Sequence, residues 1–110
     1  MKKKLALLSI LVILGIAWAG GFHGLVYKAG SGDPLGYAKV HVWNLTFNDT
    51  VGCNARGTYG IQNLDDGVYY LEAWKQEGEI MWRSYVITDT VLNGSYDECD
   101  IPCTSQGGSE

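Results

Sequence analysis

Two turn-rich segments, at 30–40 and 54–69, constrain the fold of this chain more than any other feature. Each contains several glycines, and Pro34 or a pair of aspartates adds a further turn signal. Proline fixes its own φ, and glycine supplies positive φ where a turn needs it. On either side, apolar and polar residues alternate with the period of a half-buried β-strand. The pattern therefore predicts short strands joined by tight turns.

Alternation predicts about seven strands in all. They cover residues 22–27, 38–43, 50–53, 58–62, 68–75, 80–88 and 96–101. Residues 44–49 are polar and read as a loop or a short edge strand. Seven short strands with a turn every eight to twelve residues are typical of an antiparallel β-sandwich. Within the strand at 68–75, we expect Tyr69, Leu71 and Ala73 to share one face.

The first nineteen residues have the composition of a secretory signal peptide. Three lysines at 2–4 precede an apolar run at 5–16, and the small-x-small sequence at 17–19 is a cleavage site. The alternative is an uncleaved membrane anchor, although a spanning helix needs about 20 apolar residues. We expect cleavage, and hence a secreted or extracytoplasmic protein. Its single domain would cover 20–103, with a disordered polar tail at 104–110.

The domain that remains after cleavage is acidic. The chain has eight Lys and Arg against twelve Asp and Glu, and three of the eight are the lysines at 2–4. Five basic and twelve acidic residues then give a net charge of −7. Such a domain repels phosphate backbones and anionic lipid. We therefore expect no nucleic-acid partner, and membrane association only if the signal segment stays uncleaved.

Three cysteines follow the signal segment, at Cys53, Cys99 and Cys103. An exported chain meets oxidising conditions, so we expect one disulfide and one leftover thiol. Cys99 and Cys103 would close a short loop. We favour Cys53 joined to one of these two, because a longer loop gives more stabilisation. The leftover thiol is available to a partner chain, and a zinc site would lack a well-spaced fourth ligand.

Several turn and core positions resemble the carboxypeptidase regulatory-like domain. They are Gly24-Leu-Val, Gly32-Asp-Pro-Leu-Gly-Tyr-Ala-Lys-Val, Gly57-Thr-Tyr-Gly-Ile, Leu64 and Gly67-Val-Tyr. The resemblance covers most of residues 22–88 and implies a prealbumin-like, transthyretin-like β-sandwich. It further implies that Leu64 and Tyr69 fill the core, with the Tyr69 hydroxyl bonded to backbone. Members of this family serve as accessory, cell-surface or substrate-positioning modules beside other domains.

Motifs for catalysis are missing from the sequence. It has no nucleophile motif, phosphate-binding glycine loop or metalloprotease helix, so we expect no enzymatic activity and no cofactor. His23 and His41 are isolated from other ligand types, and the acidic turns at 65–66 and 97–100 lack EF-hand spacing. We therefore expect no metal. Three glycosylation sequons begin at Asn44, Asn48 and Asn93, and we treat them as chance matches.

Four aromatic residues give the one functional signal. Trp43, Tyr70 and Trp74 fall opposite the apolar face of their strands, and Trp82 lies on the next strand. If exposed, these rings would form a flat platform that stacks on sugar rings. Polar neighbours that would orient sugar hydroxyls are His41, Glu72 and Arg83. The alternative is that the rings pack beneath loops or in the core, since Trp is highly buried on average.

These observations predict a non-catalytic exported module that binds surface carbohydrate or a protein partner. The alternative is a structural subunit or stapling module of a cell-surface assembly. Such a subunit would use the odd cysteine or an open edge strand to join its neighbours.

Overall fold

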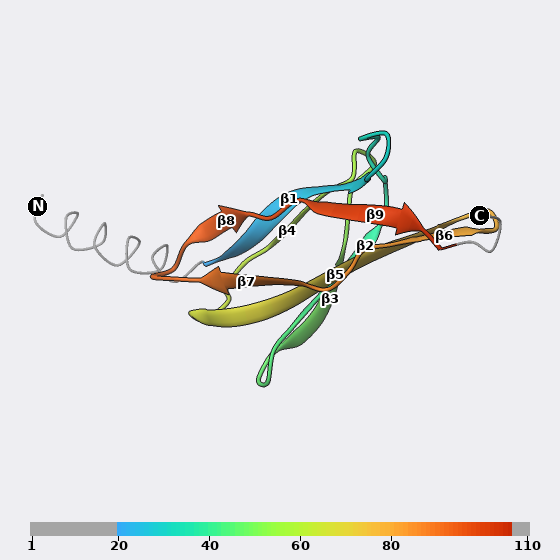
Figure 1. Cartoon of the computed structure of the whole chain (residues 1–110). Coiled ribbons are helices and arrows are strands. Elements are labelled where there is room, and N and C mark those ends of the chain that lie inside the picture. The colour runs from blue at the N-terminus through green and yellow to red at the C-terminus, as the bar shows by residue number, and fades with distance from the viewer. Residues whose placement is uncertain (1–19, 107–110) are drawn as a thin grey trace, which may run out of the picture.

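The computed structural model describes residues 20–106, which form an all-β domain (Figure 1). Its strands are β1 (Gly21–Lys28), β2 (Lys39–Trp43), β3 (Asn48–Gly52), β4 (Thr58–Ile61), β5 (Gly67–Glu77), β6 (Ile80–Arg83), β7 (Ile87–Val91), β8 (Tyr96–Glu98) and β9 (Ile101–Ser105). The all-β prediction is confirmed. The strand β9 includes the first two residues of the predicted polar tail.

Two of the sequence predictions fall partly or wholly outside the described residues. The predicted signal peptide at 1–19 does so entirely, as does the end of the predicted tail at 107–110. Between residues 20 and 106, no helix has the length and apolar character needed to cross a membrane.

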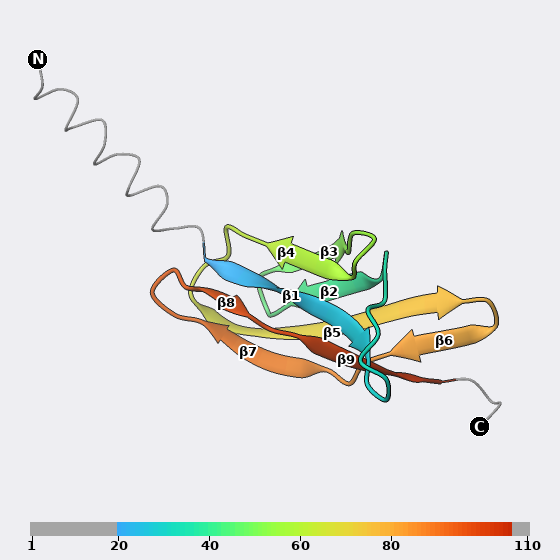
Figure 2. The same ribbon diagram turned by 90° about the horizontal axis from the view of Figure 1, so that it is seen from above.

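The strands belong to one mixed sheet that curls into a nearly closed, barrel-like shape (Figure 2). Neighbours follow the order β3-β2-β5-β6-β9-β1-β4, with β7 also beside β5 and β8 also beside β1. The curl places β4, β1, β8 and β9 on one side of the core, and β3, β2, β5 and β7 on the other (Figure 1). The prediction of a purely antiparallel arrangement was wrong, because β1 pairs in parallel with both β8 and β9.

Two predicted strands are each interrupted once, which gives nine strands in place of seven. The first break is at Ser84, whose hydroxyl accepts the Ala73 N–H at 2.9 Å while its own N–H donates to the Ala73 carbonyl. The second is at Asp100, whose Oδ1 accepts the Leu25 N–H at 2.9 Å. At both breaks a side-chain oxygen replaces a backbone acceptor, so the ladder is interrupted without leaving the N–H unpaired.

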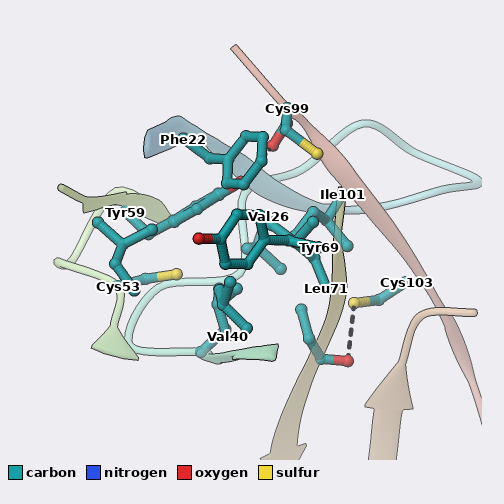
Figure 3. Close-up of a cluster of buried hydrophobic side chains, with 14 of the residues drawn as sticks. Phe22, Val26, Val40, Cys53, Tyr59, Tyr69, Leu71, Cys99, Ile101 and Cys103 are labelled. Atoms are coloured by element: carbon teal, nitrogen blue, oxygen red, sulfur yellow. Dashed lines mark hydrogen bonds between the residues drawn. The ribbon is translucent and has the colours of Figure 1, made fainter. Parts of the chain in front are cut away.

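The core lies between the two sides of the curled sheet (Figure 3). Val40 and Val42 on β2 and Leu71 on β5 are completely buried, as their alternation predicts. Tyr69 is also buried, and its hydroxyl donates to the Asp65 carbonyl at 2.7 Å. This contact matches the backbone-bonded role that the sequence predicted for Tyr69.

The predicted disulfide is not formed, and this prediction was wrong. All three cysteines lie within the described residues, and all are buried and unpaired. Cys103 donates weakly to the Ala73 carbonyl, with 3.7 Å between sulfur and oxygen (Figure 3). Counting cysteines cannot show whether their side chains meet in disulfide geometry. Here the three thiols pack as small apolar residues within one hydrophobic core cluster.

Replacement of Leu71 by Ala should lower the free energy of unfolding by about 2–5 kcal/mol, because Leu71 is completely buried and leaves a cavity. The matched control is Leu45→Ala, which removes the same atoms from a fully exposed position. We expect the control to change stability by less than about 0.5 kcal/mol. Urea unfolding measures both. Equal losses in the two variants would contradict the observed core.

Thiol labelling should be slow in the folded protein and should reach three thiols per chain after denaturation without reductant. Burial raises the pKa of Cys53, Cys99 and Cys103 to about 11, so little reactive thiolate exists at pH 8. Colorimetric titration with a disulfide reagent gives the labelling rate of the folded protein and, in urea, the number of thiols per chain. A total of one thiol after denaturation would show that a disulfide had formed.

Stability should fall as the pH rises from 9 to 11. Burial raises the pKa of each thiol from about 9 to about 11, so the folded chain keeps protons that the unfolded chain releases in this window. Burial also raises the pKa of Tyr59, which adds to the fall at higher pH. Unfolding in urea at pH 8, 9, 10 and 11 measures the slope of the free energy of unfolding against pH. A Cys103→Ala variant should show a shallower slope, and an unchanged slope would contradict this assignment.

Candidate ligand-binding face

The pairing of β2 with β5 brings three of the four predicted aromatic residues onto one outer surface. Directly opposed pairs are Trp43 with Tyr70, His41 with Glu72, and Lys39 with Trp74. Because side chains alternate along a strand, these pairs point away from the core that Val42 and Leu71 fill. We call the surface formed by His41, Trp43, Tyr70 and Trp74 the aromatic face.

Adjacent rings of the aromatic face support one another. His41 stacks on Trp43, with ring centroids 4.3 Å apart and an interplanar angle of 21°. The centroids of the Trp43 and Tyr70 rings are 5.7 Å apart. The Nε2 atom of His41 is also 2.9 Å from the Oδ1 atom of Asn48 on β3. The rings are therefore held in place before any ligand arrives, while Tyr70 remains 41% exposed.

Trp82 does not join the aromatic face. In the hairpin of β5 and β6 it lies opposite Lys75, whereas Arg83 lies opposite Trp74. Trp82 and Trp74 therefore project from opposite sides of the sheet. Trp82 packs against the core, and the Lys28 ammonium lies 4.8 Å from its ring centroid. The aromatic face thus contains three of the four expected rings, together with His41, which was expected only as a polar neighbour.

Arg83 lies beside Trp74 at the β6 end of the aromatic face. Its guanidinium carbon is 5.6 Å from the Trp74 ring centroid, and its Nη1 atom is 3.0 Å from Glu72 Oε2. The side chains of Arg83 and Glu72 are 40% and 23% exposed. Lys39 lies across from Trp74 on the other neighbouring strand. Trp74 therefore has a cationic residue opposite it on each of its two neighbouring strands.

Two surface hollows adjoin this region. One, of about 240 Å³, is lined by Asn44, Leu45, Thr46, Val68 and Tyr70. The other, of about 190 Å³, is lined by Arg83, Ser84, Tyr85, Thr104 and Gln106. Most of these lining residues were missed at the sequence level, because they come from loops and strand ends that only the folded sheet brings together. The hollows place polar side chains, such as those of Thr46 and Gln106, beside the aromatic face.

The wall of the larger hollow is shaped by Asn44. Its Oδ1 atom accepts the N–H groups of Thr46 and Phe47, both at 2.9 Å, and its Nδ2 atom donates to the Val68 carbonyl at 3.2 Å. The amide nitrogen that glycosylation at this sequon would modify therefore makes a contact between the 44–47 loop and β5. Such Asx turns fix the loop conformation.

Other residues singled out in the sequence have local partners. His23 lies on β1 with its ring centroid 4.7 Å from that of Tyr96. The carboxylate of Asp66 accepts the N–H groups of Asn93 and Gly94 at 2.8 and 2.9 Å. Nowhere in residues 20–106 do three His, Cys, Asp or Glu side chains gather as a metal site would require.

No protein-family model matches the chain, and no curated protein matches it either. The aromatic face and its polar neighbours are therefore the basis for assigning a function.

Proposed function

We propose that this protein is a non-catalytic, extracytoplasmic module that binds carbohydrate on its aromatic face. The observation that carries this proposal is a set of contacting rings on adjacent strands, with Trp43 and Tyr70 5.7 Å apart and His41 stacked behind Trp43. The C–H groups of a sugar ring pack well against aromatic faces, and this contact removes apolar surface from water.

Polar groups beside the rings suit a ligand rich in hydroxyls. Thr46 borders the hollow at Tyr70, while Thr104 and Gln106 border the hollow at Arg83. Small-molecule sites in general combine apolar contact with a few polar groups that fix orientation. This combination favours sugar over a purely apolar ligand.

The length of the aromatic face favours an oligosaccharide. Tyr70 and Trp74 are four residues apart on β5, which corresponds to about 13 Å along an extended strand. This span exceeds the width of one sugar ring. Consecutive sugar residues would therefore contact different aromatic side chains.

We also propose a distant relation to the carboxypeptidase regulatory-like domain. Leu64 and Tyr69 are buried as that resemblance implies, and Gly57 has a φ of 79°, which suits its expected turn. The two sides of the curled sheet agree with a prealbumin-like sandwich in outline. An accessory binding role is in keeping with this relation.

The alternative of a stapling subunit has less support. Its thiol route would need an exposed cysteine, whereas all three cysteines are buried, which leaves the route through an open edge strand. A protein partner on the aromatic face stays an alternative that the following test separates from carbohydrate.

Replacement of Tyr70 by Ala should weaken oligosaccharide binding about two- to tenfold, because one stacking ring is removed. The matched control is Tyr96→Ala on β8, since Tyr96 is 42% exposed and Tyr70 41%. We expect the control to bind as the unchanged protein does. Calorimetric titration with a panel of neutral and acidic hexasaccharides measures the affinities, and thermal melts confirm folding.

Equal losses in the two variants would show that the aromatic face is not the site. If no hexasaccharide of the panel binds the unchanged protein, the carbohydrate proposal is wrong and the protein-partner alternative takes its place.

A further inference from the structure

One row of residues crosses five strands of the outer surface. The cross-strand register places side by side Gly52 on β3, Lys39 on β2, Trp74 on β5, Arg83 on β6 and Thr104 on β9. We call these residues the cationic row. At its β3 end, a Cβ atom added to Gly52 would meet nothing within 4 Å, so the surface there is open. Along the row, Lys39 and Thr104 are exposed, while Trp74 and Arg83 are partly exposed.

The cationic row carries positive charge on an acidic domain. The basic residues between 20 and 106 are Lys28, Lys39, Arg56, Lys75 and Arg83. Lys28 pairs with Glu77 at 3.2 Å, and the Lys75 ammonium donates to the Gly36 carbonyl at 2.7 Å. Among the described residues, Lys39 makes no ion pair, and the only carboxylate paired with Arg83 is that of Glu72. Two of these five basic residues, Lys39 and Arg83, thus flank Trp74, and within residues 20–106 only Glu72 forms an ion pair with either of them.

The guanidinium of Arg83 is held in place, but some of its N–H groups donate no hydrogen bond to the described residues. Glu72 contacts its Nη1 atom, and Trp74 lies against one side of the group. The Nε and Nη2 atoms donate to no acceptor in the described part of the chain. Arg83 also lines the hollow of about 190 Å³ with Tyr85 and Thr104. The planar fork of an arginine matches a carboxylate, with two parallel N–H groups donating to its two oxygens.

We propose that the carbohydrate bound at the aromatic face contains uronic acid residues, and that Arg83 binds their carboxylate beside Trp74. This inference rests on the proposed carbohydrate-binding function. The sugar ring stacks on Trp74, its carboxylate enters the hollow at Arg83, and Lys39 adds attraction from the other side of the ring. A neutral sugar would leave Lys39 without a counter-charge, and it would offer no anionic acceptor to the Nε and Nη2 donors of Arg83.

The test compares each acidic ligand with the same sugar lacking its charge. The probes are hexasaccharides of galacturonate, mannuronate and hyaluronan, each beside its methyl ester, together with chondroitin and chondroitin sulfate hexasaccharides. We expect at least one acid to bind more tightly than its ester, by a ratio that shrinks between 50 and 500 mM NaCl as salt screens the charges.

The variant Arg83→Gln should weaken binding of that acid about tenfold and change binding of the ester less than about twofold. Arg83→Lys keeps the charge without the fork and should recover part of the loss. The matched control is Arg56→Gln, which removes the same charge from the exposed turn before β4, at a residue that is not part of the row. Thermal melts establish that each variant is folded.

The outcomes separate this inference from the proposed function. If esters bind as tightly as acids, or if Arg83→Gln weakens both alike, the ligand is not recognised by its charge. The carbohydrate function would still stand if Tyr70→Ala weakens that binding. A preference for chondroitin sulfate over chondroitin that depends on Arg83 would assign the anion as sulfate and overturn the carboxylate assignment. If no probe binds, both proposals fail.

Discussion

The alternation of side chains along β5 determines the core and the outer surface together. This strand has 11 residues and pairs with β2, β6 and β7. Its inward residues, such as Leu71, are buried, and its outward residues include Tyr70 and Trp74. A shift of one residue in register would exchange these two sets. Since burying Leu71 contributes roughly 1.5–3 kcal/mol, the core opposes such a shift and thereby holds the aromatic face outward.

Local periodicity predicted the faces of individual strands well. The assignment of Trp43, Tyr70 and Trp74 to the outer surface needed only the alternation within β2 and β5. The position of Trp82 depended instead on the register across the hairpin of β5 and β6, where it faces Lys75. Register depends on the turn and on packing of the partner strand, neither of which the alternation within a single strand contains.

The remaining errors also concern relations between distant segments. The parallel pairing of β1 with β8 and β9 joins the two ends of the domain, and the alternation of either segment is compatible with both strand directions. Likewise, the interruption at Asp100 depends on the Leu25 N–H, 75 residues away in sequence. The cysteine count predicted that Cys53 would pair with either Cys99 or Cys103. In the fold they are buried thiols, because the core accepts them as apolar residues.

The ion pair of Glu72 and Arg83 has more significance for binding than for folding. With side chains 23% and 40% exposed, such a pair contributes only about 0–1 kcal/mol to stability after solvent screening. The same contact, with Trp74 beside it, restricts the rotamers of Arg83 before a ligand arrives. Immobilising a side chain of this kind during association costs about 0.5–1.5 kcal/mol. Glu72 therefore neutralises part of the charge of Arg83 but holds its remaining donors in position for an anion.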